Sequence, residues 1–142
     1  MKRKIYPWVL VVLWMALIFY LSHKPATESN ELSKGITKII VETVEKVTPD
    51  VDIEVGRFNH IVRKNAHFFS YLVLGILVTN GLRSSETKRY IGFALLICVL
   101  YAISDEIHQI YVPGRSGQIK DVVIDSAGAL SGIGMYMFKK NL

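Results

Sequence analysis

Residues 5–21 read IYPWVLVVLWMALIFYL, seventeen nearly uninterrupted apolar residues that follow the basic start Met1-Lys2-Arg3-Lys4. A helix of about this length can cross the hydrocarbon core of a bilayer. The stretch is longer than the apolar part of a typical signal peptide, and no clear small-residue cleavage site follows it. We therefore expect a retained transmembrane helix, with Pro7 in the first turn, where its missing N–H costs little.

The composition of the whole chain supports a membrane protein. Hydrophobic residues make up 51% of the 142 residues, which is too apolar for an ordinary soluble domain of this size. The net charge of +5 comes from short basic clusters between apolar runs, a pattern that fits membrane loops and disfavours nucleic-acid binding. The single cysteine, Cys98, lies inside an apolar run, so neither an intramolecular disulfide nor a thiol metal cluster is expected.

The hydropathy pattern predicts an all-α polytopic membrane bundle of about four transmembrane helices, in one domain that covers residues 1–142. The expected spans lie near residues 5–21, 61–82, 90–111 and 121–138. The strictly apolar part of the last three is shorter than the roughly 20 residues that a bilayer requires, so polar residues must complete each span at one end. Ionisable groups are therefore expected near the hydrocarbon boundary, where they need partners.

A polar excursion separates the first two spans, and one part of it has helical periodicity. Apolar residues recur at helical spacing near 30–47, which predicts an amphipathic helix that begins at Ser29 or Asn30 and ends before Pro49. Such a helix can lie in the membrane interface, cover the bundle as a lid, or pack as an ordinary helix. The periodicity alone leaves these alternatives open.

The basic residues indicate the orientation of the chain. The N-terminal segment, the loop near 83–89 and the C-terminal segment together carry eight of the seventeen basic residues and a single acid, Glu86. The positive-inside rule places these segments in the cytoplasm. We therefore expect a multi-pass protein of the plasma membrane with both termini cytoplasmic, and with the amphipathic helix and the loop at Arg115 outside. Gly128 and Gly132, four residues apart, predict a smooth helix face for close packing.

Three polar clusters, far apart in the sequence, come to the outer membrane face in this topology. The first holds Arg63, His67 and Tyr71, which repeat every fourth residue and share one helix face. The second is the run from Asp105 to Gln109. The third is a turn around Arg115 that is followed by two carboxylates one helical turn apart, Asp121 and Asp125.

This mixture of residues suits recognition of an anionic headgroup. Arg115 offers a planar fork for phosphate, and Lys64 or Arg63 offers a second positive charge. Asp105 or Asp125 can then act as a general base, with His67 or His108 as the acid partner. The alternative is an interhelical ion-pair network that only holds the bundle together.

Other kinds of chemistry are less well matched by the sequence. The histidines and carboxylates are metal-ligand types, but their spacing matches no zinc signature, so neither a metal nor another cofactor is expected. Ser116 and Ser126 have no identifiable triad partners. The chain has no internal repeats, and four short helices leave little room for alternating access, which disfavours a transporter.

The motifs resemble those of the VanZ-like family, which is named for a membrane protein linked to teicoplanin resistance. The resemblance rests on the runs Lys64-Asn65-Ala66-His67-Phe68 with Tyr71, Asp105-Glu106 with Gln109, Pro113-Gly114-Arg115-Ser116, and Asp121 with Asp125. It implies a bacterial integral membrane protein, and some members of the family lower susceptibility to lipophilic glycopeptides. The family pattern leaves the position of His108 free and does not specify the excursion before the second span.

Two hypotheses of function follow. In the first, the protein acts on or binds an anionic cell-envelope lipid or a lipid-linked wall precursor. Its acid–base set comprises Asp105, Glu106, His67 and Asp121, and its binding residues are Lys64, Asn65, Tyr71, Gln109, Arg115 and Asp125. In the second, it is a non-catalytic binding or scaffold protein whose charged cluster is structural. Expected partners are membrane lipids together with a wall precursor or a glycopeptide, and the sequence decides neither enzymatic activity nor oligomeric state.

The orientation can be tested by cysteine labelling. In a background without Cys98, a cysteine at position 115 should react with a membrane-impermeant maleimide in intact cells, because its loop is expected outside. A cysteine at position 88 should react only after permeabilisation. The opposite pattern would overturn the orientation.

Overall fold

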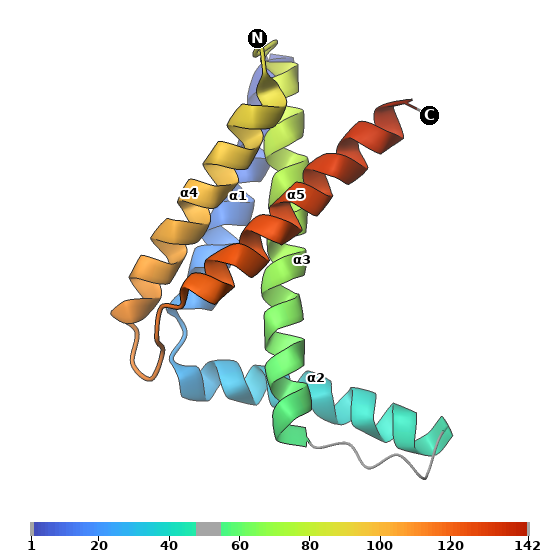
Figure 1. Cartoon of the computed structure of the whole chain (residues 1–142), viewed down its shortest axis with the longest axis vertical. Helices are drawn as coiled ribbons and strands as arrows, with labels where there is room; N and C mark the ends of the chain where they lie inside the picture. Colours follow the sequence, from blue (N-terminus) through green and yellow to red (C-terminus); the bar gives the residue numbers. More distant parts are fainter. Residues whose placement is uncertain (1, 48–54, 142) are drawn as a thin grey trace.

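The computed structural model describes residues 2–47 and 55–141, and these residues form five helices and no strand (Figure 1). The helices are α1 (Lys2–His23), α2 (Ala26–Val47), α3 (Val55–Ser84), α4 (Tyr90–Ile110) and α5 (Ile119–Asn141). Side chains are described for residues 5–47 and 58–139. The all-α prediction is confirmed, whereas Pro49, the expected stop of the amphipathic helix, lies outside the described residues.

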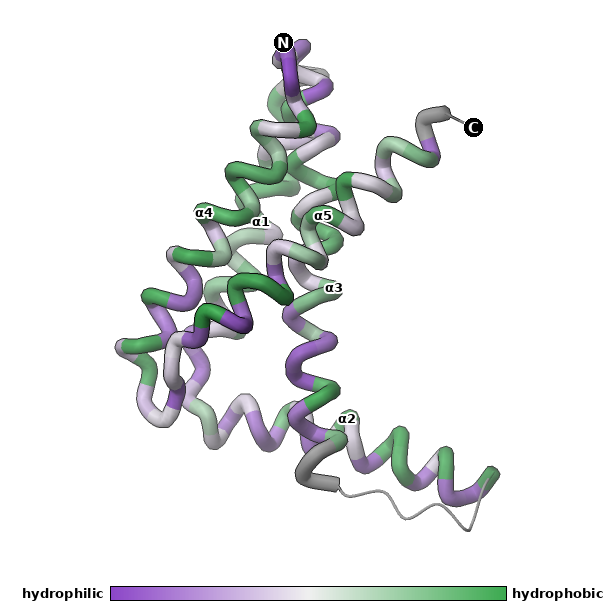
Figure 2. Tube along the Cα trace, viewed as in Figure 1, coloured by the Kyte–Doolittle hydropathy of each residue, from purple (hydrophilic) through white to green (hydrophobic). Residues whose placement is uncertain are grey.

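Three of the described helices are long and apolar enough to cross a membrane. These segments are Ile5–His23, Phe58–Ser84 and Tyr90–Ile110, and Figure 2 shows that they are largely hydrophobic toward the end with the termini, whereas the part of α3 near α2 is largely hydrophilic. The fourth expected span, 121–138, forms most of α5 but is not among these three. Its low hydropathy reflects Asp121, Asp125 and several small residues that pack closely against α3.

Helix α3 is the central element, since it packs against α1, α2, α4 and α5. Its 30 residues correspond to about 45 Å of helix, which exceeds the roughly 30 Å of a hydrocarbon core. The polar first part of α3 extends beyond the other long helices toward α2 (Figures 1 and 2). The termini and the α3–α4 loop lie at one end of the bundle, and α2 and the α4–α5 loop lie at the other.

The contact between α3 and α5 is the most extensive in the fold, and glycines make it possible. A Cβ atom on Gly128 would meet the Phe68 carbonyl oxygen, and one on Gly132 would meet the Leu72 carbonyl oxygen. Gly75 of α3 faces the backbone of α5 in the same way. The predicted close approach of the Gly128 and Gly132 face is confirmed.

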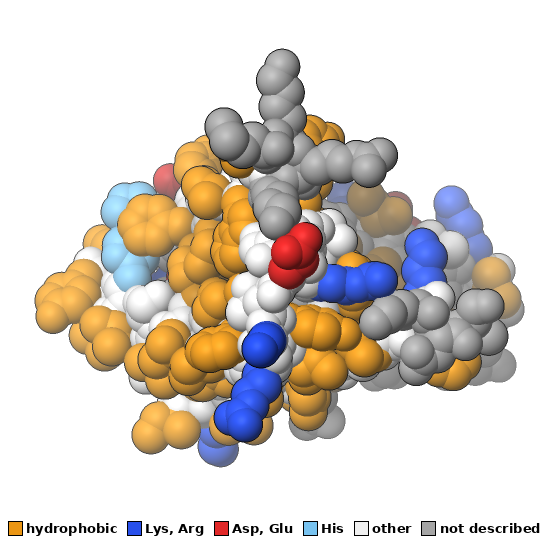
Figure 3. Space-filling view, turned by 90° about the horizontal axis from the view of Figure 1, so that it is seen from above, with side chains coloured by type: hydrophobic (Ala, Val, Ile, Leu, Met, Phe, Trp, Pro, Cys, Tyr) orange, Lys and Arg blue, Asp and Glu red, His pale blue; other side chains and the backbone are white. Residues whose placement is uncertain are grey.

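The interior and the exterior of the bundle differ in the size of their side chains. The buried stripe of α4 consists largely of small residues, Ala94, Cys98 and Ala102, which pack with Leu74 and Val78 of α3. Many large apolar side chains instead point outward, as expected for a surface that faces lipid. Figure 3, seen from the end with the termini, shows hydrophobic side chains around the perimeter and basic ones on the end face.

Helix α2 crosses the other end of the bundle at a steep angle to α3 (Figure 1). It begins at Ala26, so the predicted start at Ser29 or Asn30 is wrong. The Pro25 carbonyl accepts the first helical hydrogen bond, from the Ser29 N–H at 3.0 Å, so the helix starts directly after Pro25. The buried face of α2 is made by Ser33, Thr37 and Val41. Its larger apolar residues, including Leu32 and Ile36, stay exposed, which does not fit an ordinary packing helix.

The glycine contact can be tested by a matched pair of substitutions on α5. Gly132→Ala places a methyl group against the Leu72 carbonyl and should destabilise the protein by about 1–3 kcal/mol, which would lower the melting temperature in detergent. Gly134→Ala meets nothing within 4 Å and should be neutral or stabilising by up to about 1 kcal/mol. Equal melting temperatures for the two variants would contradict the contact.

Candidate functional site

The three polar clusters meet where α1 ends, α4 ends and α5 begins, beside the middle of α3. One ring nitrogen of His67 and one carboxylate oxygen each of Asp105 and Asp125 all lie within 4.8 Å of one another. Both carboxylates also interact electrostatically with the fully buried Tyr71. The prediction that these helices place His67, Tyr71, Asp105 and Asp125 together is confirmed.

Helix periodicity and the glycine contact explain this convergence. Asp125 precedes Gly128 by less than one turn, and His67 directly precedes Phe68, so the backbone contact between Gly128 and Phe68 brings the two side chains together. On α4, the buried stripe of Ala94, Cys98 and Ala102 continues at helical spacing through Asp105. The acid is therefore buried because it occupies the core-facing position of its helix.

Asp105 has one oxygen that is well held and one that is not. Its Oδ2 accepts hydrogen bonds from Ser22 Oγ at 2.9 Å and from Gln109 Nε2 at 3.3 Å. Its Oδ1 is buried and accepts none from the described residues. Ser22, at the end of α1, was not predicted from the sequence, because a serine next to an apolar span looks like an ordinary boundary residue.

Glu106 links α4 to the start of α5. Its Oε2 accepts a hydrogen bond from the backbone N–H of Gln118 at 2.8 Å, and its Oε1 accepts one from Gln109 Nε2 at 3.4 Å. A carboxylate at the N-terminus of a helix stabilises otherwise unpaired N–H groups. These bonds give Glu106 a positioning role for α5, and Gln118 is a second contributor that the sequence did not reveal.

The two carboxylates of α5 lie in different environments. Asp121 is partly exposed and pairs with Lys64, whose Nζ lies 3.2 Å from Oδ1. Asp125 is fully buried, and its nearest basic partner is His67, with Nδ1 3.6 Å from Oδ1. Neither oxygen of Asp125 accepts a hydrogen bond from the part of the chain that the structure describes.

The turn between α4 and α5 places Arg115 against α1 and α2. Gly114 has a φ of 74°, and the Arg115 N–H donates to the Val112 carbonyl at 3.1 Å. The half-buried Arg115 donates through Nη2 to the Leu21 carbonyl at 3.4 Å, whereas its Nε lacks a partner among the described residues. Burial lowers the pKa of the Arg115 guanidinium, and the nearby positive charge of Arg63 lowers this pKa further.

Two other predicted residues lie away from this cluster. Asn65 is exposed and lines neither of the two cavities described below. His108 pairs with His23, with Nδ1 of His23 3.0 Å from Nε2 of His108, and both rings lie beside Phe19. His108 is therefore not a member of the group formed by His67, Asp105 and Asp125.

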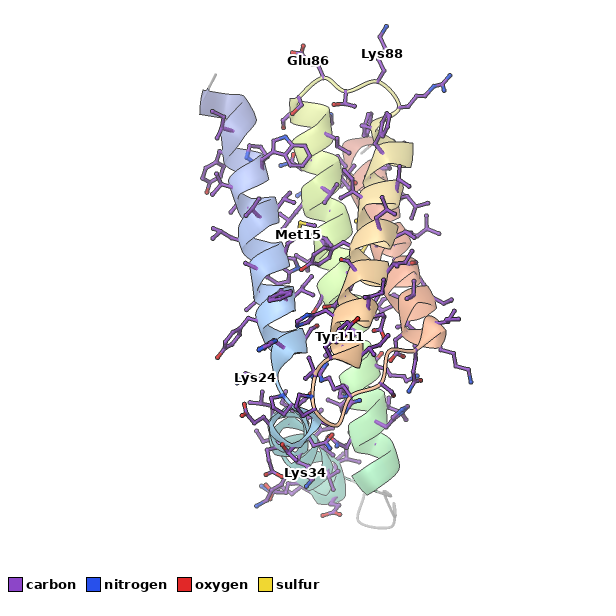
Figure 4. All side chains as sticks on the ribbon, turned by 90° about the vertical axis from the view of Figure 1, so that its left-hand side faces the viewer. Met15, Lys24, Lys34, Glu86, Lys88 and Tyr111 are labelled. Carbon is purple, nitrogen blue, oxygen red and sulfur yellow. The ribbon has the colours of Figure 1, made fainter. Side chains whose placement is uncertain are left out.

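Two cavities flank His67. The larger, of about 360 Å³, lies between α1, α2, α3 and the α4–α5 loop, and Lys24 marks its level in Figure 4. Its walls are mainly apolar, and they also carry Lys24, Arg63 and Arg115. The smaller, of about 30 Å³, has a polar lining that includes Lys64, Asp121 and Asp125. It has room for one ion or one water molecule.

The model of the VanZ/LLP1 family matches residues 7–140, which is nearly the whole chain. The chain belongs to the VanZ/LLP1 family. No curated protein and no solved structure matches the chain. All the positions that carry the resemblance to VanZ-like proteins, from Lys64 to Asp125, fall inside the VanZ/LLP1 match.

Substitution of Asp125 tests whether the polar cluster is only a structural ion-pair network. Asp125→Asn removes a buried charge that no hydrogen-bond donor among the described residues stabilises, so the melting temperature of the purified protein in EDTA should stay the same or rise. If the pair with His67 held the bundle together, the substitution would instead destabilise it by about 3–5 kcal/mol. Thermal melting in detergent separates the two outcomes.

Proposed function

We propose that this VanZ/LLP1 protein binds an anionic cell-envelope lipid, or a lipid-linked wall precursor, at the outer face of the plasma membrane. The observation that carries the proposal is the 360 Å³ cavity, which combines an apolar wall with three cationic side chains. Its volume falls within the range of small-molecule sites. It is large enough for a headgroup and the first part of an acyl or prenyl chain.

The apolar wall suits a hydrocarbon chain. Ile18 and Leu21 of α1 face Leu32 and Ile36 of α2 across the cavity. In water, the exposure of Leu32 and Ile36 would be unfavourable, whereas contact with lipid removes this cost. The small buried face of α2, with Thr37 donating to Asn59 at 3.4 Å, holds the helix against α3 while its apolar residues stay available.

The cationic side of the cavity suits a phosphate. Arg63 and Arg115 are close enough that the positive charge of one disfavours that of the other, and an anion between them would relieve this repulsion. Arg63 is fixed by its hydrogen bond to Asn30 Oδ1 at 3.1 Å. The free Nε–H of Arg115 provides a donor for a charge-assisted hydrogen bond.

The proposal includes a complete membrane topology. Helix α5, of 23 residues or about 35 Å, is long enough to serve as the fourth span, and its two carboxylates meet α3, Asp121 at Lys64 and Asp125 at His67. The end of the bundle that carries the basic segments, with both termini and the α3–α4 loop, would lie in the cytoplasm. Helix α2 would then lie along the outer interface, with Leu32 and Ile36 toward the acyl chains.

The groups available for chemistry are fewer than the sequence suggested. Glu106 is engaged with α5 and Asp121 with Lys64, so the buried groups that keep unpartnered atoms among the described residues beside the partly exposed His67 are Tyr71, Asp105 and Asp125. Binding is therefore the part of the first hypothesis that we propose, and an acid–base role for Asp105, Glu106, His67 and Asp121 stays a prediction. A bound wall precursor would connect the chain to the glycopeptide susceptibility that the family resemblance implies.

The experiment uses Arg115→Lys, which keeps the charge but loses the planar fork. Purified full-length protein in detergent is titrated with phosphatidylglycerol, with a polyprenyl phosphate and with phosphatidylcholine, and binding is followed by native mass spectrometry. The two anionic lipids should bind more tightly than phosphatidylcholine, and the tighter of them identifies the class of ligand. Arg115→Lys should weaken anionic binding about 10- to 100-fold, the effect of losing a charged hydrogen bond of about 1.5–3 kcal/mol.

The control is Arg83→Lys, which makes the same change at the opposite end of α3, where Arg83 donates to the Tyr136 hydroxyl. It should leave lipid affinity unchanged. The melting temperature of each variant is measured in parallel, so that a folding defect is not mistaken for a binding defect. A stable Arg115→Lys protein with undiminished affinity for both anionic lipids would contradict the proposal.

A further inference from the structure

Four buried side-chain atoms in the centre of the candidate site have no hydrogen-bond partner among the described residues. Both oxygens of Asp125, Oδ1 of Asp105 and the hydroxyl of Tyr71 are buried, and none forms a hydrogen bond with the described residues. Asp125 and Tyr71 are completely buried, and Asp105 is 2% exposed. An unsatisfied buried polar group is costly, and more so when it is charged. Several such groups in one place indicate that they surround a ligand.

The geometry of these groups fits a small cation. The ligand atoms of His67, Asp105 and Asp125 lie within 4.8 Å of one another. In a tetrahedral site, two ligands that each lie about 2.1 Å from a zinc ion are about 3.4 Å apart. Rotation of the side chains has to bring the three ligand atoms closer together to bind one ion.

The charge balance favours a cation at the same place. Two buried carboxylates face a single imidazole, and Glu106 adds to the negative potential. Among the described residues, no Lys or Arg forms an ion pair with Asp105 or Asp125. Lys64 pairs with Asp121, and the guanidinium of Arg115 donates to a carbonyl of α1. The charge of Arg115 also acts on Asp105, but only at longer range, and a divalent ion would add positive charge in direct contact with both carboxylates.

We propose that His67, Asp105 and Asp125 form a binding site for one divalent first-row transition-metal ion, such as Mn²⁺ or Zn²⁺. One imidazole and two carboxylates suit these ions better than Mg²⁺ or Ca²⁺, which prefer oxygen ligands alone. Three protein ligands leave at least one coordination position open for water or for a ligand. The proposal does not depend on the lipid-binding function, because it rests on different atoms.

The hydrogen bonds around Asp105 are arranged as they are around metal-binding carboxylates. Ser22 and Gln109 both donate to Oδ2, which fixes the carboxylate and leaves Oδ1 for the ion. Such hydrogen bonds around metal ligands orient them and raise affinity. The polar cavity of about 30 Å³ is lined by His67 and Asp125 but not by Asp105, so it lies at one side of the proposed site. The three ligands come from three helices, which is why the sequence has no recognisable metal spacing and a metal was not expected.

The test uses full-length protein without a histidine tag, purified in detergent and stripped with EDTA. Mn²⁺, Zn²⁺ and Mg²⁺ are added separately, excess ion is removed, and bound metal is counted by inductively coupled plasma mass spectrometry. We expect one equivalent of Mn²⁺ or Zn²⁺ with a raised melting temperature, and no stoichiometric Mg²⁺. Wild-type protein that retains no Mn²⁺ or Zn²⁺ would overturn the proposal, whatever the lipid titrations show.

Substitutions at the proposed ligands and beside them test where the ion binds. Asp125→Asn and His67→Gln should abolish stoichiometric binding and the metal-dependent rise in melting temperature. Ser22→Ala, which leaves all three ligands in place, should weaken metal affinity about 10- to 100-fold. Asp121→Asn, one turn from Asp125, changes a carboxylate that lines the small cavity but is not one of the three proposed ligands, and it should retain one equivalent. Loss of binding in Asp121→Asn but not in Asp125→Asn would place the ion elsewhere and refute the assignment.

Discussion

The backbone contact between α3 and α5 is the constraint on which the rest of the structure depends. Gly128 and Gly132 let the helices approach until only backbone separates them, with the carbonyls of Phe68 and Leu72 on the other side. Side chains just beyond such a contact are forced together, which puts Asp125 next to His67. In a membrane, where helices gain little from the hydrophobic effect against one another, close packing of this kind is a main source of association.

The site contains charges that stabilise the fold and charges that do not. Glu106 is fixed by the start of α5, and Asp121 by Lys64, so each has an evident structural function. Asp125 has no donor among the described residues, although burying a charge is costly unless it is paired. This difference argues against a purely structural network. The site therefore has two parts, a buried acidic centre and a cationic cavity, and His67 lies between them.

The sequence predicted which segments form helices and which end of the bundle holds the polar residues, because both follow from hydropathy and helical periodicity. It did not predict the start of α2 at Ala26. Ser29 and Asn30 looked like good N-caps, whereas the first helical hydrogen bond is accepted by the carbonyl of Pro25, before both of them. Ser22 and Gln118 were missed because their contributions arise from contacts with another helix, which no local pattern records. Arg63 shares a helix face with His67, yet it turns to Asn30 of α2, a contact that periodicity cannot reveal.

The central claim is that the buried acidic centre is a ligand site built by helix packing. The most direct measurement is an anomalous difference map from crystals grown in a lipid mesophase with Mn²⁺ and recorded at the manganese absorption edge. The account predicts a single strong peak between the imidazole of His67 and the carboxylates of Asp105 and Asp125. A map with well-ordered side chains and no peak at that position would contradict it.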